Sequence, residues 1–149
     1  MKKVKIGLLT LLMVVVLSGC GNKALVPDKM DAKLKKEGFI VNDVTVNIKD
    51  QNVEKVVTAN NKKYQFEYYV FKTEKLAKES YKRNKEQFHK YKKKSNKEKE
   101  KNKDNYDKYT LELSDTYDAV IRSKKVVVYV SVSMEHKGDV TKILNKLGL

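Results

Sequence analysis

The chain has 149 residues, of which 33 are Lys or Arg and 19 are Asp or Glu, so its formal net charge is +14. This length is enough for one domain with a modest hydrophobic core. The chain has only one cysteine, which excludes a disulfide within the chain and any metal or redox site built from several cysteines.

The first residues have the composition of an export signal. Three lysines lie among the first five residues, and residues 6–17 are apolar apart from Gly7 and Thr10. This run of 12 residues is too short to cross a hydrocarbon layer as a helix, which takes about 20 residues. The order of basic, apolar and then small residues is typical of a secretory signal peptide.

The signal ends in Leu-Ser-Gly-Cys at residues 17–20, which resembles the lipobox of bacterial lipoproteins. The resemblance implies cleavage after Gly19 and attachment of diacylglycerol to the thiol of Cys20, with no other cofactor. Residues 1–19 are then the signal peptide and residues 20–26 a short lipid-anchored linker. The expected location is the outer face of the bacterial cytoplasmic membrane. The alternative is an uncleaved anchor in which Cys20 has no special role.

A helix and three strands are predicted after the linker. Pro27 and Asp28 suit the start of a helix, and Gly38 suits the left-handed residue that ends it. Alternating apolar residues then predict strands over residues 44–48, 53–59 and 64–71. In the third of these, we expect Tyr69 to be the most exposed aromatic side chain, because its neighbours already supply a core face.

The middle of the chain reads as a long helix followed by a basic segment. Thr73 is the predicted N-cap, and apolar side chains recur at helical spacing as far as Tyr91. No apolar side chain follows until Tyr106, so the intervening residues cannot bury a core face. We therefore interpret residues 92–105 as a basic helical extension or a loop, and expect residues 92–103 to be dispensable for folding.

The last part of the chain predicts three more strands and a helix. The strands cover residues 109–113, 117–121 and 126–134. The last of them has the strongest alternation and apolar residues on both faces, so we expect it to be central in the sheet. A final helix over residues 140–147 ends in Gly148 and Leu149, the same glycine-then-apolar pattern as Gly38 and Phe39.

These elements predict an α+β fold in which residues 27–149 form a single domain. We expect a two-layer structure with an antiparallel sheet of about six strands, arranged as two βββα units, and an extra N-terminal helix. Short turns between the strands favour helices packed on one face of the sheet.

Catalytic and metal-binding patterns are missing from the sequence. His89 and His136 are isolated and lie in different predicted elements. The glycines form no phosphate-binding loop, and Glu98 with Glu100 lies within the lysine run, where lysines are the expected partners. We predict no catalytic residue and no metal ligand, and we expect a protein that is not an enzyme.

The lysine run is the candidate binding element. It can be a solvated surface, a contact for anionic lipid headgroups or wall polymers, or a nucleic-acid contact; export argues against the last. The candidate contact residues are Lys92, Lys93, Lys94, Lys97, Lys99, Lys101 and Lys103.

Together these features predict a membrane-anchored extracytoplasmic lipoprotein that acts as a non-enzymatic binding or accessory protein at the cell surface. Its expected partners are membrane lipid and either anionic wall polymers or a membrane protein complex. The layout of lipobox, short linker and one basic α+β domain resembles small lipoproteins that protect a producing cell from an antimicrobial peptide, which is one alternative. An enzyme acting on the cell wall is the other.

Overall fold

A computed structural model describes residues 25–149 of the chain. The predicted signal peptide, the cleavage site at Gly19 and the lipid-attachment site at Cys20 lie outside these residues. Among the described residues, no helix has the length and apolar character needed to cross a membrane.

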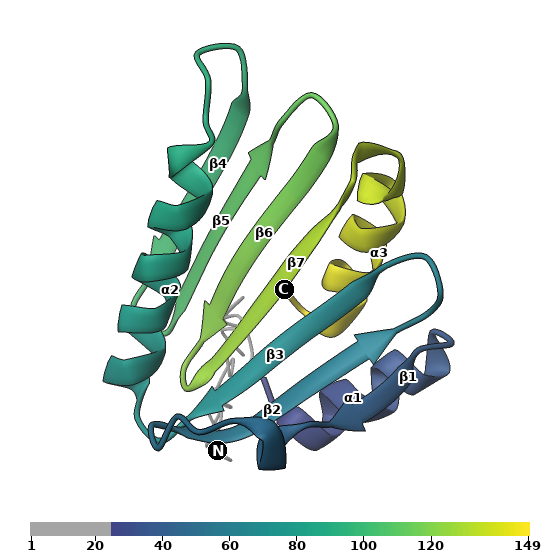
Figure 1. Cartoon of the computed structure of the whole chain (residues 1–149), viewed down its shortest axis with the longest axis vertical. Helices are drawn as coiled ribbons and strands as arrows, with labels where there is room; N and C mark the ends of the chain where they lie inside the picture. The colour runs from purple at the N-terminus through teal and green to yellow at the C-terminus, as the bar shows by residue number, and fades with distance from the viewer. Residues whose placement is uncertain (1–24) are drawn as a thin grey trace, which may run out of the picture.

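The fold is built on one antiparallel sheet of seven strands in the order β1-β2-β3-β7-β6-β5-β4 (Figure 1). Because β7 lies in the middle, with β3 on one side and β6 on the other, its predicted central position is confirmed. The strands are β1 (Ile40–Asp43), β2 (Val53–Asn60), β3 (Gln65–Phe71), β4 (Lys97–Lys103), β5 (Tyr106–Glu112), β6 (Thr116–Ser123) and β7 (Val126–Ser133).

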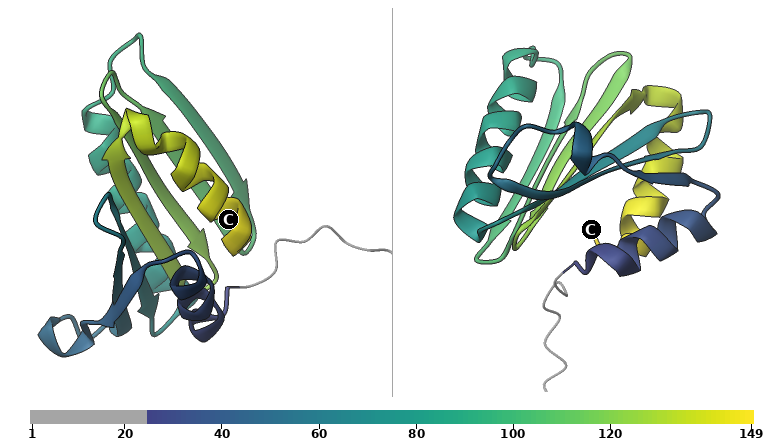
Figure 2. Two further views of the ribbon diagram at one scale, coloured as in Figure 1. Left: turned by 90° about the vertical axis from the view of Figure 1, so that its right-hand side faces the viewer. Right: turned by 60° about the horizontal axis from the view of Figure 1, so that its bottom comes forward.

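In the described part of the chain, three α-helices cover the sheet, and they lie on both of its faces (Figure 2). Helices α1 (Pro27–Lys36) and α3 (Lys137–Leu147) pack on one face, where they share a large apolar core with β2, β3, β6 and β7. Helix α2 (Glu74–Lys90) packs on the other face, over a smaller core that includes Ala77, Tyr81 and Val127. The α+β class is therefore confirmed, but the expected two layers are wrong, because β3, β5, β6 and β7 carry apolar side chains on both faces.

Glycines end α1 and α3 as the sequence predicted. Gly38 and Gly148 have φ angles of 85° and 88°, in the left-handed region that favours glycine. The N–H of the next residue then bonds back into the helix, from Phe39 to the Leu34 carbonyl at 3.1 Å and from Leu149 to the Leu144 carbonyl at 2.9 Å. At the start of α2, the hydroxyl of Thr73 accepts a hydrogen bond from the Leu76 N–H at 3.2 Å, which confirms the predicted N-cap.

The strand predicted over residues 44–48 is wrong. The carboxylate of Asp43 accepts the N–H of Thr45 at 2.9 Å, and this turn ends β1 and starts a short 3-10 helix, Thr45–Asn47. Val46 is 94% exposed as a result. The true edge strand, β1, is the segment just before, which pairs with β2.

The helical extension or loop predicted over residues 92–105 is wrong for residues 97–103. Helix α2 ends at Lys90, and residues Lys97–Lys103 form β4, which pairs with β5 along its whole length. This strand makes the number seven instead of six, and four strands, not three, lie between α2 and α3. The two βββα units are therefore not found. Residues Lys97–Lys103 have no apolar side chain, so the strand is held by its backbone hydrogen bonds to β5 and not by burial of a core face.

Candidate functional site

The charged side chains of β4 alternate by sign between the two faces of the sheet. In a strand, successive side chains point to opposite faces. The sequence Lys-Glu-Lys-Glu-Lys-Asn-Lys therefore places its four lysines on the face that α3 covers, and its two glutamates on the face that α2 covers. The lysines are Lys97, Lys99, Lys101 and Lys103, and we call them the β4 lysine row.

The two glutamates hold β4 against the basic side of α2. Glu100 pairs with Lys85 at 2.5 Å. Glu98 pairs with Lys92, lies 3.3 Å from the Nδ1 of His89, and accepts the Tyr109 hydroxyl at 3.0 Å. The hydrogen bonds from Lys92 and Lys85 are the main reason that the pKa values of Glu98 and Glu100 lie below their ordinary range. The interpretation of these glutamates as lysine partners is confirmed.

On the opposite face, the lysine row borders a basic hollow of about 420 Å³. Lys99 and Lys101 line it from β4, Lys108 from β5, and Lys137 from α3. Lys101 lies directly opposite Lys108 in the strand register. Burial, reinforced by the charge of Lys101, lowers the pKa of Lys108.

Opposite charges offset only part of this cluster. Glu112 pairs with Lys137 at 2.8 Å, and Glu100, which also lines the hollow, is paired with Lys85, so Lys99, Lys101 and Lys108 have no acidic partner among the lining residues. Like charges that face each other across a strand pair are destabilising. A bound anion would relieve that repulsion, so the hollow has the chemistry of an anion site.

The remaining candidate lysines do not join the row. Lys92 is taken by Glu98 on the α2 side, whereas Lys93 and Lys94 are exposed in the connection between α2 and β4. The sequence thus identified the segment, but in the structure only four of its seven lysines lie together, on one face of β4. Lys108 and Lys137 were missed because they lie outside the run and join it only through the fold.

The two histidines are not brought together as a site. His89 lies on α2, 3.4 Å from the Tyr109 hydroxyl, while the His136 ring packs against Tyr64 with centroids 5.3 Å apart. Within residues 25–149, no group of three or more His, Cys, Asp or Glu side chains is arranged to hold a metal ion.

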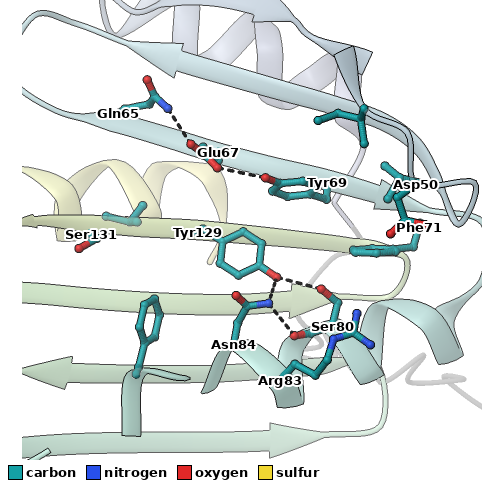
Figure 3. Close-up of a pocket in the computed structure, with 14 residues that line it drawn as sticks. Asp50, Gln65, Glu67, Tyr69, Phe71, Ser80, Arg83, Asn84, Tyr129 and Ser131 are labelled. Atoms are coloured by element: carbon teal, nitrogen blue, oxygen red, sulfur yellow. Dashed lines mark hydrogen bonds between the residues drawn. The ribbon is translucent and has the colours of Figure 1, made fainter. Parts of the chain in front are cut away.

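A second cavity, of about 570 Å³, lies on the face of the sheet that α2 only partly covers (Figure 3). We call it the α2 groove. Its walls come from α2 and from the segment between β1 and β2, and its floor comes from β3 and β7. It is lined by Ile48, Asp50, Val53, Gln65, Glu67, Tyr69, Phe71, Ser80, Arg83, Asn84, Phe88, Tyr129, Val130 and Ser131.

A fixed hydrogen-bond network forms one side of the α2 groove. The amide of Asn84 donates to the Tyr129 hydroxyl at 2.6 Å and to the Ser80 carbonyl at 2.9 Å, and the Ser80 hydroxyl lies 3.0 Å from the same tyrosine oxygen. The two bonds to Tyr129 join α2 to β7. Burial raises the pKa of Tyr129, which keeps this hydroxyl protonated as part of the network.

The other side of the groove is centred on Glu67. Its carboxylate accepts the Gln65 amide at 2.8 Å and the Tyr69 hydroxyl at 3.1 Å. The Tyr69 ring meets the Tyr129 ring edge-on, with centroids 5.4 Å apart. Burial and the charge of Glu67 raise the pKa of Tyr69 to about 12. Tyr69 is half-buried in the groove, not fully exposed.

Sequence reasoning missed the charged members of this groove. Asn84 was the available signal, since it is a polar residue at a position of α2 where the helical spacing calls for an apolar one. Glu67 and Arg83 belong to different elements, and only the sheet topology brings them to one cavity. Comparison with protein-family models, with curated proteins and with solved structures found no match to this chain.

Proposed function

We propose that this protein is a lipid-anchored extracytoplasmic binding protein whose β4 lysine row contacts the anionic headgroups of the membrane to which it is tethered. The observation that carries the proposal is the separation of charge on β4, where all four lysines share one face and both glutamates are neutralised on the other.

The place where the chain enters the fold supports this orientation. The N–H of Leu25 donates to the Ser123 hydroxyl at 3.3 Å, at the end of the sheet that holds the turns between β4 and β5 and between β6 and β7 (Figure 1). Leu25 also packs on the same core face as α1 and α3. From Cys20 to Leu25 the chain can span at most about 17 Å. A lipid on Cys20 therefore keeps the lysine-bearing face near the bilayer.

The expected attraction between the lysines and the bilayer is of a size that suits a role in orienting the domain. Each lysine near an anionic bilayer contributes about 1 kcal/mol, and this attraction decays over a Debye length of about 8 Å at physiological salt. Two acyl chains already anchor the protein stably. The lysines would therefore set which face of the domain meets the membrane.

Vesicle binding by a chain that begins at Gly21 tests the proposal, because lipidation would hide a contact of this strength. The test variant replaces the β4 lysine row, Lys97, Lys99, Lys101 and Lys103, with Gln. The matched control replaces Lys75, Lys78, Lys82 and Lys90, which are exposed on α2. Both variants lose four positive charges, so a general effect of net charge would weaken the vesicle binding of both variants equally.

We expect the unmodified chain to bind phosphatidylglycerol vesicles at low salt, the control variant to bind nearly as well, and the test variant to lose binding. Equal loss in both variants would refute a specific lysine face. Binding to soluble poly(glycerol phosphate) but not to vesicles would replace the membrane with a wall polymer as the partner. Lysines on an edge strand also discourage association between sheets, so sedimentation should confirm that the test variant remains monomeric.

A further inference from the structure

We propose that the α2 groove binds a short peptide, with the peptide carboxylate at Arg83 and its ammonium or amide N–H groups at Glu67. This site lies on the opposite face of the sheet from the β4 lysine row, and the proposal is independent of membrane binding. The volume of about 570 Å³ lies within the usual range for small-ligand pockets.

Arg83 on α2 and Glu67 on β3 provide charges of opposite sign, and Asp50 adds a second carboxylate to the lining. Arg83 lies on the exposed side of α2 and makes no hydrogen bond to the other residues drawn in Figure 3. Within residues 25–149 it also has no acidic partner in an ion pair, so its guanidinium is available to a carboxylate. Glu67 uses one bond on each oxygen, to Gln65 and Tyr69, and a carboxylate oxygen can accept a second.

The amides beside these charges suit a peptide backbone. Both donor hydrogens of Asn84 are used within the network, which leaves its carbonyl oxygen as an acceptor. Gln65 donates to Glu67 in the same way and also keeps a carbonyl oxygen. Two acceptors on opposite sides of one cavity are placed to receive N–H groups.

Apolar side chains complete the cavity and suit a peptide side chain. Phe88 lines the groove from α2, Tyr69 and Phe71 from β3, Val53 from the start of β2, and Ile48 from the segment before it. The Tyr69 and Phe71 rings are stacked, with centroids 6.3 Å apart. Because the Asn84–Tyr129–Ser80 network fixes α2 relative to the sheet, this arrangement exists before a ligand arrives.

The test is calorimetric titration of the full chain in detergent micelles with a library of tripeptides that have free termini. Two further libraries carry an amidated C-terminus or an acetylated N-terminus. Arg83→Gln and Glu67→Gln are the test variants, and Lys82→Gln is the control, because it removes one charge from the neighbouring exposed position of α2.

We expect the free library to bind, and both C-terminal amidation and Arg83→Gln to weaken binding about tenfold through loss of a charge-assisted hydrogen bond. Acetylation and Glu67→Gln should each weaken it by a smaller factor, and Lys82→Gln should leave it unchanged. Isotope-edited NMR should show shifts in the side-chain amides of Asn84 and Gln65. No binding of the free library at millimolar concentration would overturn the proposal, as would equal binding of the amidated library. Binding of an N-acetylglucosamine oligosaccharide but not of peptides would assign the groove to sugars and overturn it too.

Discussion

Arg122 on β6 lies directly opposite Asp107 on β5, and its Nε donates to the Asp107 carboxylate at 2.5 Å although the two residues are only 1% and 4% exposed. The remaining guanidinium nitrogens donate to the carbonyls of Lys124 at 3.3 Å and Asp104 at 3.1 Å. One buried side chain therefore joins the β4–β5 turn to the β6–β7 turn. Both turns lie at the end of the sheet where the chain enters the fold.

Replacement of Arg122 with Met should destabilise the protein by roughly 3–5 kcal/mol, because it leaves the Asp107 carboxylate buried without a partner. The double variant Arg122→Met with Asp107→Leu should recover much of this loss. Urea unfolding of the single and double variants measures both quantities. A double variant no more stable than Arg122→Met would show that the turn contacts matter more than the ion pair.

Tyr81→Phe should raise stability by about 1 kcal/mol. Within residues 25–149, the Tyr81 hydroxyl is the one buried side-chain polar atom without a hydrogen-bond partner, and such a group costs free energy to bury. The phenylalanine ring keeps the packing under α2. Thermal and urea unfolding should agree on the gain, and a clear loss of stability would mean that the hydroxyl is hydrogen-bonded to a water.

Alkaline pH should unfold the protein between about pH 10 and pH 12. Burial raises the pKa values of Tyr69 and Tyr106 to about 12, whereas the unfolded chain ionises near 10. A raised pKa in the folded state gives stability that is present below pH 10 and is lost as the pH rises toward the folded value. Phenolate absorbance and circular dichroism should change together. Glu67→Gln should move the Tyr69 titration toward 10, and an unchanged titration would remove Glu67 as a cause.

Acid should loosen β4 before the rest of the sheet. The lowered pKa values of Glu98 and Glu100 give stability above pH 4.5 that is lost as the pH falls through their folded values. These groups are about one-third exposed, so the double variant Glu98→Gln with Glu100→Gln should cost at most about 1 kcal/mol. Amide exchange should accelerate in β4 but not in β7. Uniform acceleration would contradict this local effect.

Deletion of residues 97–103 should cause association. The sequence led us to expect this segment to be dispensable, but β4 covers the edge of β5, whose residues are mostly buried. An uncovered edge of this kind pairs readily with another sheet. Sedimentation of the deletion variant should show oligomers, and a stable monomer would restore the original expectation.

The elements that the sequence predicts well are those decided by local rules. The alternation in residues 126–134 identifies the central strand. The position after α1 has a left-handed backbone conformation that glycine adopts readily and most other residues do not, so Gly38 marks the end of that helix. The segment at 44–48 also alternates, but the short-range bond from Thr45 to Asp43 ends the strand first. Periodicity shows that α2 has an apolar stripe, yet it cannot show which face of the sheet the stripe covers.

The sites depend on contacts between distant parts of the chain and were only partly predictable. Composition identified the lysine run. Its lysines and glutamates are separated onto opposite faces only because residues Lys97–Lys103 form a strand, and a segment without apolar residues gives no pattern that predicts a strand. The α2 groove requires the register between β3 and β7, which places Glu67 opposite Tyr129. No local pattern contains that relationship.

The alternation of charge on β4 also locks the alignment of this strand with its neighbour. A slip of one residue would turn every side chain to the opposite face. The lysines would then meet Lys85, His89 and Lys92 on the α2 side, and the glutamates would lose the cations that now hold them. A single inserted residue in β4 is therefore far more disruptive than two, so the spacing of this segment is constrained even though its individual side chains are solvent-exposed.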